Sequence, residues 1–137
     1  MKFEEFKNVL LYRTIVEWNE DTIILDNGVQ ISIEETEQDC CAGAYGEFTN
    51  VKLNAVITDV TKPKYKRWED GDTYGCEAVV KILHNRNLIC KAEANADAGN
   101  GGYYYSVASF VVKECGKQPQ HVFFVHSDGS EDYEEDW

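Results

Sequence analysis

The sequence predicts an α+β domain that is rich in β structure. We expect a mostly antiparallel, twisted sheet of about eight strands, arranged in hairpins and a meander, with a short N-terminal helix. Two observations predict the sheet: apolar and polar residues alternate in several segments, and turn-forming Asn and Gly residues separate those segments. A third predicts the helix, because the apolar residues near the N-terminus recur at helical spacing.

The length and composition of the chain favour one globular domain. The chain has 137 residues, of which 43% are hydrophobic, close to the usual value for globular proteins. We expect residues 1–126 to form a single domain and residues 127–137 to form an acidic C-terminal tail. No run of about 18 apolar residues is present, and the N-terminus lacks the apolar core of a signal peptide. We therefore expect a cytoplasmic protein that does not enter membranes.

The helix is expected over residues 3–11. Phe3, Phe6 and Leu10 fall on one face, at positions i, i+3 and i+7. The acidic residues Glu4 and Glu5 lie in the first turn, where the positive end of the helix dipole favours carboxylates.

Residues 14–18, 22–25 and 29–33 are predicted to form a three-stranded meander. The second turn contains Asn27 and Gly28, the pair that favours a type I′ turn because both central positions of that turn need a positive φ. Apolar and polar residues alternate within 29–33, so we expect one face of that strand to be buried.

The next part of the chain predicts mostly irregular structure. Residues 42–54 contain two glycines and two asparagines and are expected to form a loop. A strand is expected over 54–60, interrupted by the basic run 62–67 and followed by an exposed loop over 68–72. Basic residues beside Trp68 resemble a small nucleic-acid patch. Because the whole chain is acidic, we expect this run to pair instead with acids of this chain or of a partner.

Residues 75–84 and 88–96 are predicted to pair as a hairpin. The even-numbered positions are apolar in both segments, so even positions must face even positions. That register requires a three-residue loop, with Asn87 in the left-handed conformation. Beyond this hairpin, a turn is expected at 99–102.

The hairpin register separates two of the cysteines. Ile82 lies opposite Cys90, and Cys76 lies opposite Ala96. Cys76 and Cys90 are then about 20 Å apart, at ~3.3 Å per residue, which excludes a shared metal or a disulfide between them.

Two more strands are expected toward the C-terminus. Residues 103–112 become apolar on both faces, which is typical of a central strand, and residues 120–126 form the last strand.

The adjacent pair Cys40 and Cys41, next to Asp39, is the most unusual motif. The chain has five cysteines, an odd number without the spacing of a secreted disulfide framework, so we expect reduced thiols. Three alternatives stay open: a structural role in a tight loop, a soft-metal site, or a redox role. For a metal site, zinc is the candidate cofactor and Cys40 and Cys41 are the candidate ligands. The further ligands would come from a wider set, which comprises Asp39, Cys76, Cys115, His84, His121 and His126.

The net charge of −12 is concentrated at the two ends of the chain. Residues 1–50 carry −8, residues 51–126 carry +2, and residues 127–137 carry −6. Such a chain repels nucleic acid at long range and is attracted to basic surfaces, including those of proteins that bind nucleic acid. The alternative is that the charge serves solubility alone.

Acidic residues are therefore the candidate partner-binding groups. The tail lacks the glycine and glutamate positions of an EF-hand calcium loop. It could instead imitate a run of phosphates, or be a solvated tail. No nucleophile with a base and no paired acid and base is evident, so we do not expect an enzyme. The candidate binding residues are Glu34, Glu35, Glu37, Asp128, Glu131, Asp132, Glu134, Glu135, Asp136 and Trp137. We expect Trp137 and Tyr133 to be aromatic anchors of the interface.

Three motifs resemble an uncharacterised domain of small phage and prophage proteins. They lie at residues 17–28, 37–41 and 102–107, and the Gln-Asp-Cys-Cys sequence at 38–41 is the most specific. The similarity covers about residues 12–113. It implies a phage or prophage protein that acts in the cytoplasm of a bacterial host.

The resemblance leads to two functional hypotheses. By analogy with anti-CRISPR proteins, we expect the chain to bind a host defence nuclease that targets nucleic acid, of the CRISPR effector type. It would block DNA loading by protein–protein contact, without binding nucleic acid directly. The alternative is a zinc-binding structural or accessory protein of the phage, with Cys40 and Cys41 as ligands.

Overall fold

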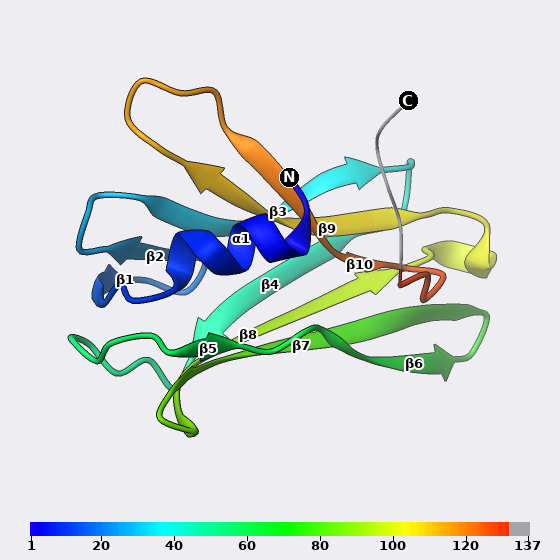
Figure 1. Ribbon diagram of the computed structural model, residues 1–137. Helices are drawn as coiled ribbons and strands as arrows, with labels where there is room; N and C mark the ends of the chain where they lie inside the picture. The colour runs from blue at the N-terminus through cyan, green and yellow to red at the C-terminus, as the bar shows by residue number, and fades with distance from the viewer. Residues whose placement is uncertain (132–137) are drawn as a thin grey trace.

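Within residues 1–131, ten antiparallel strands form two five-stranded sheets that pack face to face (Figure 1). The structure is a computed structural model that describes residues 1–131. The predicted β-rich α+β class with antiparallel pairing is confirmed, but the predicted count of about eight strands is wrong. The difference arises because two stretches in which no strand was predicted each contribute one: the predicted loop 42–54, and the basic run 62–67 together with the start of the predicted loop 68–72.

The first sheet has the strand order β1-β2-β3-β9-β10. Its first three strands form the predicted meander, and β9 lies between β3 and β10, as its two apolar faces predict. Every residue of β9 except the last is buried. The strands are β1 (Ile15–Trp18), β2 (Thr22–Leu25), β3 (Gln30–Gln38), β9 (Ser106–Lys113) and β10 (Gln120–His126).

The second sheet has the order β4-β8-β7-β5, and β6 also pairs with β7. β5 and β6 both pair with the same strand, β7. Pro63 lies between them and interrupts the pairing, because proline has no backbone N–H to donate. The strands are β4 (Ala44–Thr49), β5 (Asp59–Val60), β6 (Lys64–Asp70), β7 (Thr73–His84) and β8 (Asn87–Asp97), and β8 is followed by the 3-10 turn η1 (Asn100–Gly102).

The predicted helix, α1 (Phe3–Leu10), covers one open side of the sandwich and packs against both sheets (Figure 1). Its Phe6 ring stacks on Phe110 of β9, and Phe110 stacks in turn on Phe124 of β10. Lys7 forms an ion pair with Asp59 of β5 at 2.8 Å. The apolar face of the helix therefore closes the core, while its charged face contacts an edge of the second sheet.

The hairpin β7–β8 confirms the predicted register and corrects the predicted turn. Ile82 lies opposite Cys90, as expected. The turn itself has two residues, Asn85 and Arg86, both with positive φ, and the register shifts between Ile82 and Leu83. Asn87 is therefore a strand residue. A bulge compensates for the shorter loop and keeps the even positions facing the core.

The turn between β2 and β3 also differs from the prediction. Gly28 has a φ of +87°, whereas Asn27 does not have a positive φ. The Leu25 amide donates to the Val29 carbonyl at 2.9 Å, which closes a three-residue loop. This pattern fits a loop that ends in a left-handed glycine rather than a type I′ turn.

Candidate functional site

Four segments that carry acidic but no basic side chains meet at one end of the sandwich. They are residues 35–47, 69–77, 93–105 and 127–131, which lie at the right of Figure 1. Together they contain twelve Asp and Glu residues and no Lys, Arg or His. We refer to this surface as the acidic end.

Strand pairing brings these segments together. β3 and β10 flank β9, so Gln38 and Ser127 lie on either side of Ser106. At the same end of the second sheet, Asp97 lies opposite Gly75. The Ser106 hydroxyl joins the two sheets, because its oxygen lies 2.9 Å from the Gly43 carbonyl oxygen and 2.8 Å from the Asp97 carbonyl oxygen, and its single hydrogen is shared between these two acceptors.

Exposed tyrosines surround this surface. Tyr45, Tyr74, Tyr103 and Tyr105 expose 67%, 38%, 85% and 38% of their surface, respectively. Tyr74 packs beside Gly102, and Tyr105 stacks on His126 with ring centroids 5.7 Å apart. Aromatic rings that are held in place but exposed are common at protein interfaces.

A shallow hollow of about 270 Å³ continues the acidic end onto the outer face of the second sheet. Glu47 lies directly opposite Glu93 across the strand pair, and Glu77 also lines the hollow. Two like charges facing each other destabilise a sheet. Lys91 relieves part of this repulsion through an ion pair with Glu93 at 2.8 Å. A cationic side chain of a partner, placed in the hollow, would relieve more of it.

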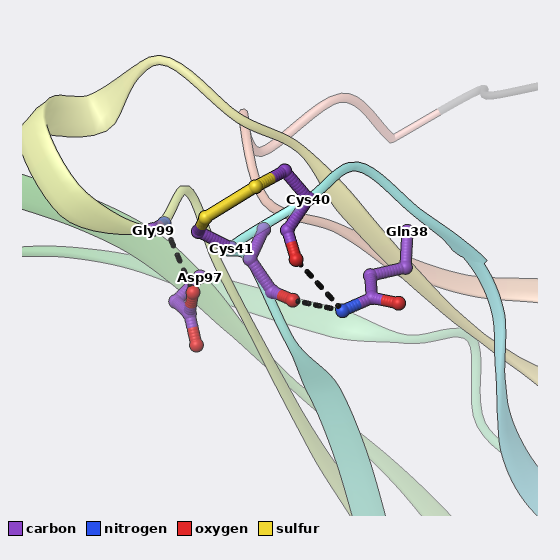
Figure 2. The surroundings of a disulfide bond; sticks show 6 residues. Gln38, Cys40, Cys41, Asp97 and Gly99 are labelled. Atoms are coloured by element: carbon purple, nitrogen blue, oxygen red, sulfur yellow. Dashed lines mark hydrogen bonds between the residues drawn. A yellow bond between two sulfur atoms is a disulfide. The ribbon is translucent and has the colours of Figure 1, made fainter.

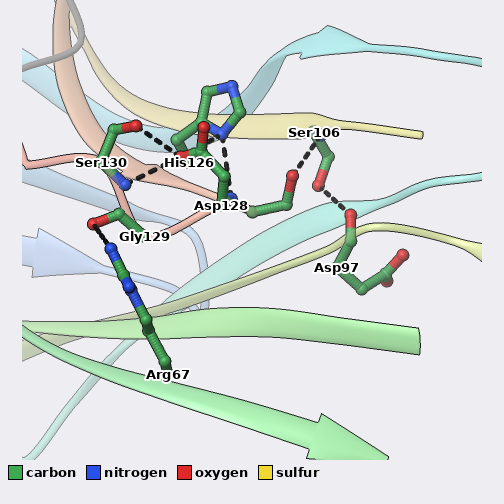
Figure 3. Close-up of polar contacts among 8 residues, drawn as sticks. Arg67, Asp97, Ser106, His126, Asp128, Gly129 and Ser130 are labelled. Atoms are coloured by element: carbon green, nitrogen blue, oxygen red, sulfur yellow. Dashed lines mark hydrogen bonds and ion pairs between the residues drawn. The ribbon is translucent and has the colours of Figure 1, made fainter. Parts of the chain in front are cut away.

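Residues 127–130 form a turn that is attached to the domain (Figure 3). Asp128 accepts hydrogen bonds from the amide and hydroxyl of Ser130, at 2.8 and 2.5 Å. Arg67 approaches the carbonyl of Gly129 at 3.5 Å. The predicted tail therefore begins with an ordered turn, and the division of the chain at residue 126 stays a prediction.

The charge state of Asp128 is set within this turn. Burial by itself raises the pKa of its carboxyl, but the hydrogen bonds from Ser130 and the charges of His126 and Arg67 outweigh this and lower the pKa. His126 Nδ1 lies 3.0 Å from the Asp128 amide nitrogen and 2.9 Å from its carboxylate. An unprotonated Nδ1 accepts from the amide, whereas a protonated one donates to the carboxylate.

The predicted binding residues of β3 are partly engaged within the protein. Glu34 accepts a hydrogen bond from Ser32 and forms an ion pair with Lys113 at 3.4 Å. Chiefly because of the Ser32 bond, the pKa of Glu34 is below its usual value. Glu35 accepts from the Ala44 amide at 2.8 Å, and Glu37 is half-buried. Their role in binding stays a prediction, with Glu35 and Glu37 at the acidic end.

The other predicted binding residues divide into two groups. Asp128 and Glu131 lie at the acidic end. Outside the described residues are Asp132, Tyr133, Glu134, Glu135, Asp136 and Trp137.

The adjacent cysteines also lie at the acidic end, and they form a disulfide (Figure 2). The expectation of reduced thiols is therefore wrong for this pair; Cys76, Cys90 and Cys115 are free. Because a disulfide carries no thiolate, the bonded pair cannot supply the two predicted zinc ligands. In residues 1–131, no group of three or more His, Cys, Asp and Glu side chains is arranged to hold a metal ion.

Sequence reasoning missed several residues of this surface. Tyr45 and Glu47 lie in a segment predicted to be a loop, which is β4. Glu77 and Glu93 occupy outward positions between the buried even residues of β7 and β8, so the predicted alternation could have identified them. The run of three tyrosines at 103–105 was a further signal.

Comparison with known proteins gives one match. A family model described as "Domain of unknown function (DUF7448)" matches residues 8–111. No curated protein and no solved structure matches the chain.

Within residues 1–131, none of the helices has both the length and the apolar character that a membrane span requires.

Proposed function

We propose that this chain, which belongs to the DUF7448 family of domains of unknown function, binds another protein through the acidic end. The observation that carries this proposal is the meeting of four base-free segments, with twelve acidic residues, at a surface bordered by exposed tyrosines. The role is one of binding and obstruction and needs no catalytic group.

The chemistry of this surface fits a partner that is rich in Arg and Lys. Carboxylates attract and pair with cationic side chains, and tyrosine rings bind them through cation–π contacts. Glu47 and Glu93, which repel each other in the free protein, would gain from a cation between them. Surfaces that bind nucleic acid have this basic character.

More specifically, the proposed partner is a host defence nuclease that targets nucleic acid, of the CRISPR effector type. The acidic end would occupy the basic cleft that otherwise receives DNA. This more specific proposal is supported by the resemblance to a domain of phage and prophage proteins. It requires that the chain acts in a bacterial cytoplasm. Direct binding to nucleic acid is opposed by the net charge of −12.

The proposal is tested with two triple variants that remove equal charge. The site variant is Glu47→Gln, Glu77→Gln and Glu93→Gln; the control changes Glu4, Glu17 and Glu114 to Gln, which lie outside the acidic end. Both are compared with the unchanged chain for inhibition of DNA cleavage by purified CRISPR effectors. Three ion pairs of about 0.5 kcal/mol each predict a roughly tenfold loss of potency for the site variant alone. Equal effects of the two variants, or no effect of either, would contradict the proposed site.

A truncation separates the contribution of the tail. Removing residues 132–137 deletes four acidic residues and leaves the turn at 127–130 in place. We expect weaker inhibition that is also more sensitive to salt. Unchanged inhibition would exclude the tail from the interface without affecting the case for the acidic end.

A further inference from the structure

We propose that the Cys40–Cys41 disulfide is a reversible redox site that exchanges electrons with an external dithiol reductant. The two residues are adjacent in the chain, and both are exposed. This inference is independent of the proposed partner, because it rests on the geometry and chemistry of the cysteine turn alone.

The disulfide has little to contribute to the stability of the fold. In the chain-entropy view, a disulfide stabilises a protein according to the length of the loop that it closes. Cys40 and Cys41 have a sequence separation of one, the shortest loop available. The bond can therefore open and close without a large effect on folding, which favours a redox role over a structural one.

Contacts that do not involve sulfur hold the turn in place (Figure 2). The Asp39 amide donates to the Tyr105 carbonyl at 2.9 Å, and the Ala42 amide donates to the Asp39 carbonyl at 3.0 Å. The Gln38 side chain donates to the Ala42 carbonyl at 2.8 Å. These bonds remain when the disulfide is reduced. The two thiols then stay close together, and the disulfide can re-form at little cost in conformational entropy.

None of the other cysteines can supply the electrons. Cys76 and Cys90 are fully buried, and burial raises the pKa of the Cys90 thiol to about 12. Cys115 is exposed but follows the end of β9, whereas the disulfide lies beside the start of that strand. The reductant must therefore come from outside the chain.

The exchange proceeds in two balanced steps. A thiolate of the reductant attacks one sulfur of the pair and forms a mixed disulfide, and the other cysteine leaves as a thiolate that takes up a proton. The second thiol of the reductant then displaces the first cysteine, which also takes up a proton. The products are the Cys40/Cys41 dithiol and the oxidised reductant, after transfer of two electrons.

A monothiol is a poor reductant for such a site. After the first step, the neighbouring cysteine thiol is held beside the mixed disulfide and reverses the reaction faster than a second monothiol arrives. A dithiol completes the reduction within the same complex. The proposed physiological reductant is therefore a protein dithiol of the thioredoxin class.

Thiol labelling with a maleimide and intact-mass measurement tests the proposal. A Cys115→Ser background removes the exposed free cysteine. In the native state, we expect no label before reduction and two labels after treatment with dithiothreitol. Adding Cys40→Ser to this background should give one label without any reductant. Two labels before reduction, or none after it, would overturn the proposal.

A second comparison tests the kind of reductant. At equal total thiol concentration, dithiothreitol should yield the two-label species, and glutathione should leave most of the protein unlabelled. Equal reduction by the two reagents would contradict the preference for a dithiol.

Discussion

Ser106 and Ser127 hydrogen-bond to each other in both directions. The Ser127 amide donates to the Ser106 carbonyl at 3.0 Å, and the Ser106 amide donates to the Ser127 hydroxyl at 3.1 Å. Both residues are buried. On the opposite side of the chain from Ser127, the Asp39 amide donates to the carbonyl of Tyr105, which directly precedes β9. The Ser106–Ser127 pair therefore holds the start of the C-terminal tail beside the cysteine turn.

The first prediction concerns this reciprocal pair. Ser127→Ala removes the acceptor of the buried Ser106 amide, which should lower the free energy of unfolding by ~1–3 kcal/mol. Chemical denaturation measures this change. Ser130→Ala is the control, because Ser130 is only partly buried and its loss should cost less. A larger loss for Ser130→Ala would show that the turn, rather than the reciprocal pair, anchors the tail.

The second prediction concerns the contact between the cysteine turn and Gly99. Gly99 has a φ of +70°, and a Cβ there would lie 2.7 Å from the Cys41 carbonyl oxygen. Gly116 has a φ of +78° but nothing within 4 Å of its Cβ position. Both Gly→Ala variants incur the backbone cost of about 1 kcal/mol. Gly99→Ala should lose a further ~1–3 kcal/mol from crowding, as thermal unfolding of the two variants would reveal.

Equal losses for the two variants would mean that the turn moves away from Gly99 without cost. In that case the close packing of Cys41 on Gly99 would not help to hold the turn.

The third prediction concerns stability at acidic pH. Glu34 and Asp128 both have a lowered pKa in the folded protein, so their charged forms favour folding. This contribution is present above the ordinary carboxyl pKa of about 4 and is lost as the pH falls through the lower folded pKa. Asp128→Asn should therefore lower the melting temperature at pH 7, and the difference from the unchanged chain should shrink below about pH 4. A difference that stays constant with pH would contradict this assignment.

The fourth prediction concerns metal content. Because the bonded Cys40 and Cys41 carry no thiolate, oxidised protein purified without a metal-binding tag should contain no stoichiometric zinc by elemental analysis. One zinc per chain, lost in Cys40→Ser, would instead support the zinc-binding alternative.

Local patterns predicted part of the fold well. The even apolar positions of 75–84 and 88–96 gave the register of β7 and β8. β4 was missed because its glycine suggested a loop. Gly46 in fact lies where the two sheets approach closely, and a Cβ there would be 2.5 Å from Ile33 and 2.7 Å from the Glu93 carbonyl. Its small size serves packing, which a single sequence does not distinguish from turn formation.

The candidate site was predicted only in part. The acids of 34–39 and of the tail were identified from composition. The meeting of segments 35–47 and 127–131 around Ser106 depends on the pairing of β9 with both β3 and β10, which joins segments far apart in the sequence. The disulfide was not expected, because the odd number of cysteines and their spacing match no secreted disulfide framework. Adjacent residues in an extended chain point to opposite faces, but the turn at Asp39–Ala42 brings the two sulfur atoms together.

We propose that the acidic end occupies a surface built for nucleic acid. The most direct measurement is a competition experiment with labelled double-stranded DNA bound to a purified DNA-targeting CRISPR effector. We predict that the chain releases the DNA, and that the variant with Gln at Glu47, Glu77 and Glu93 needs a roughly tenfold higher concentration. A nuclease that holds the chain and the DNA together, with unchanged affinity for DNA, would contradict the account.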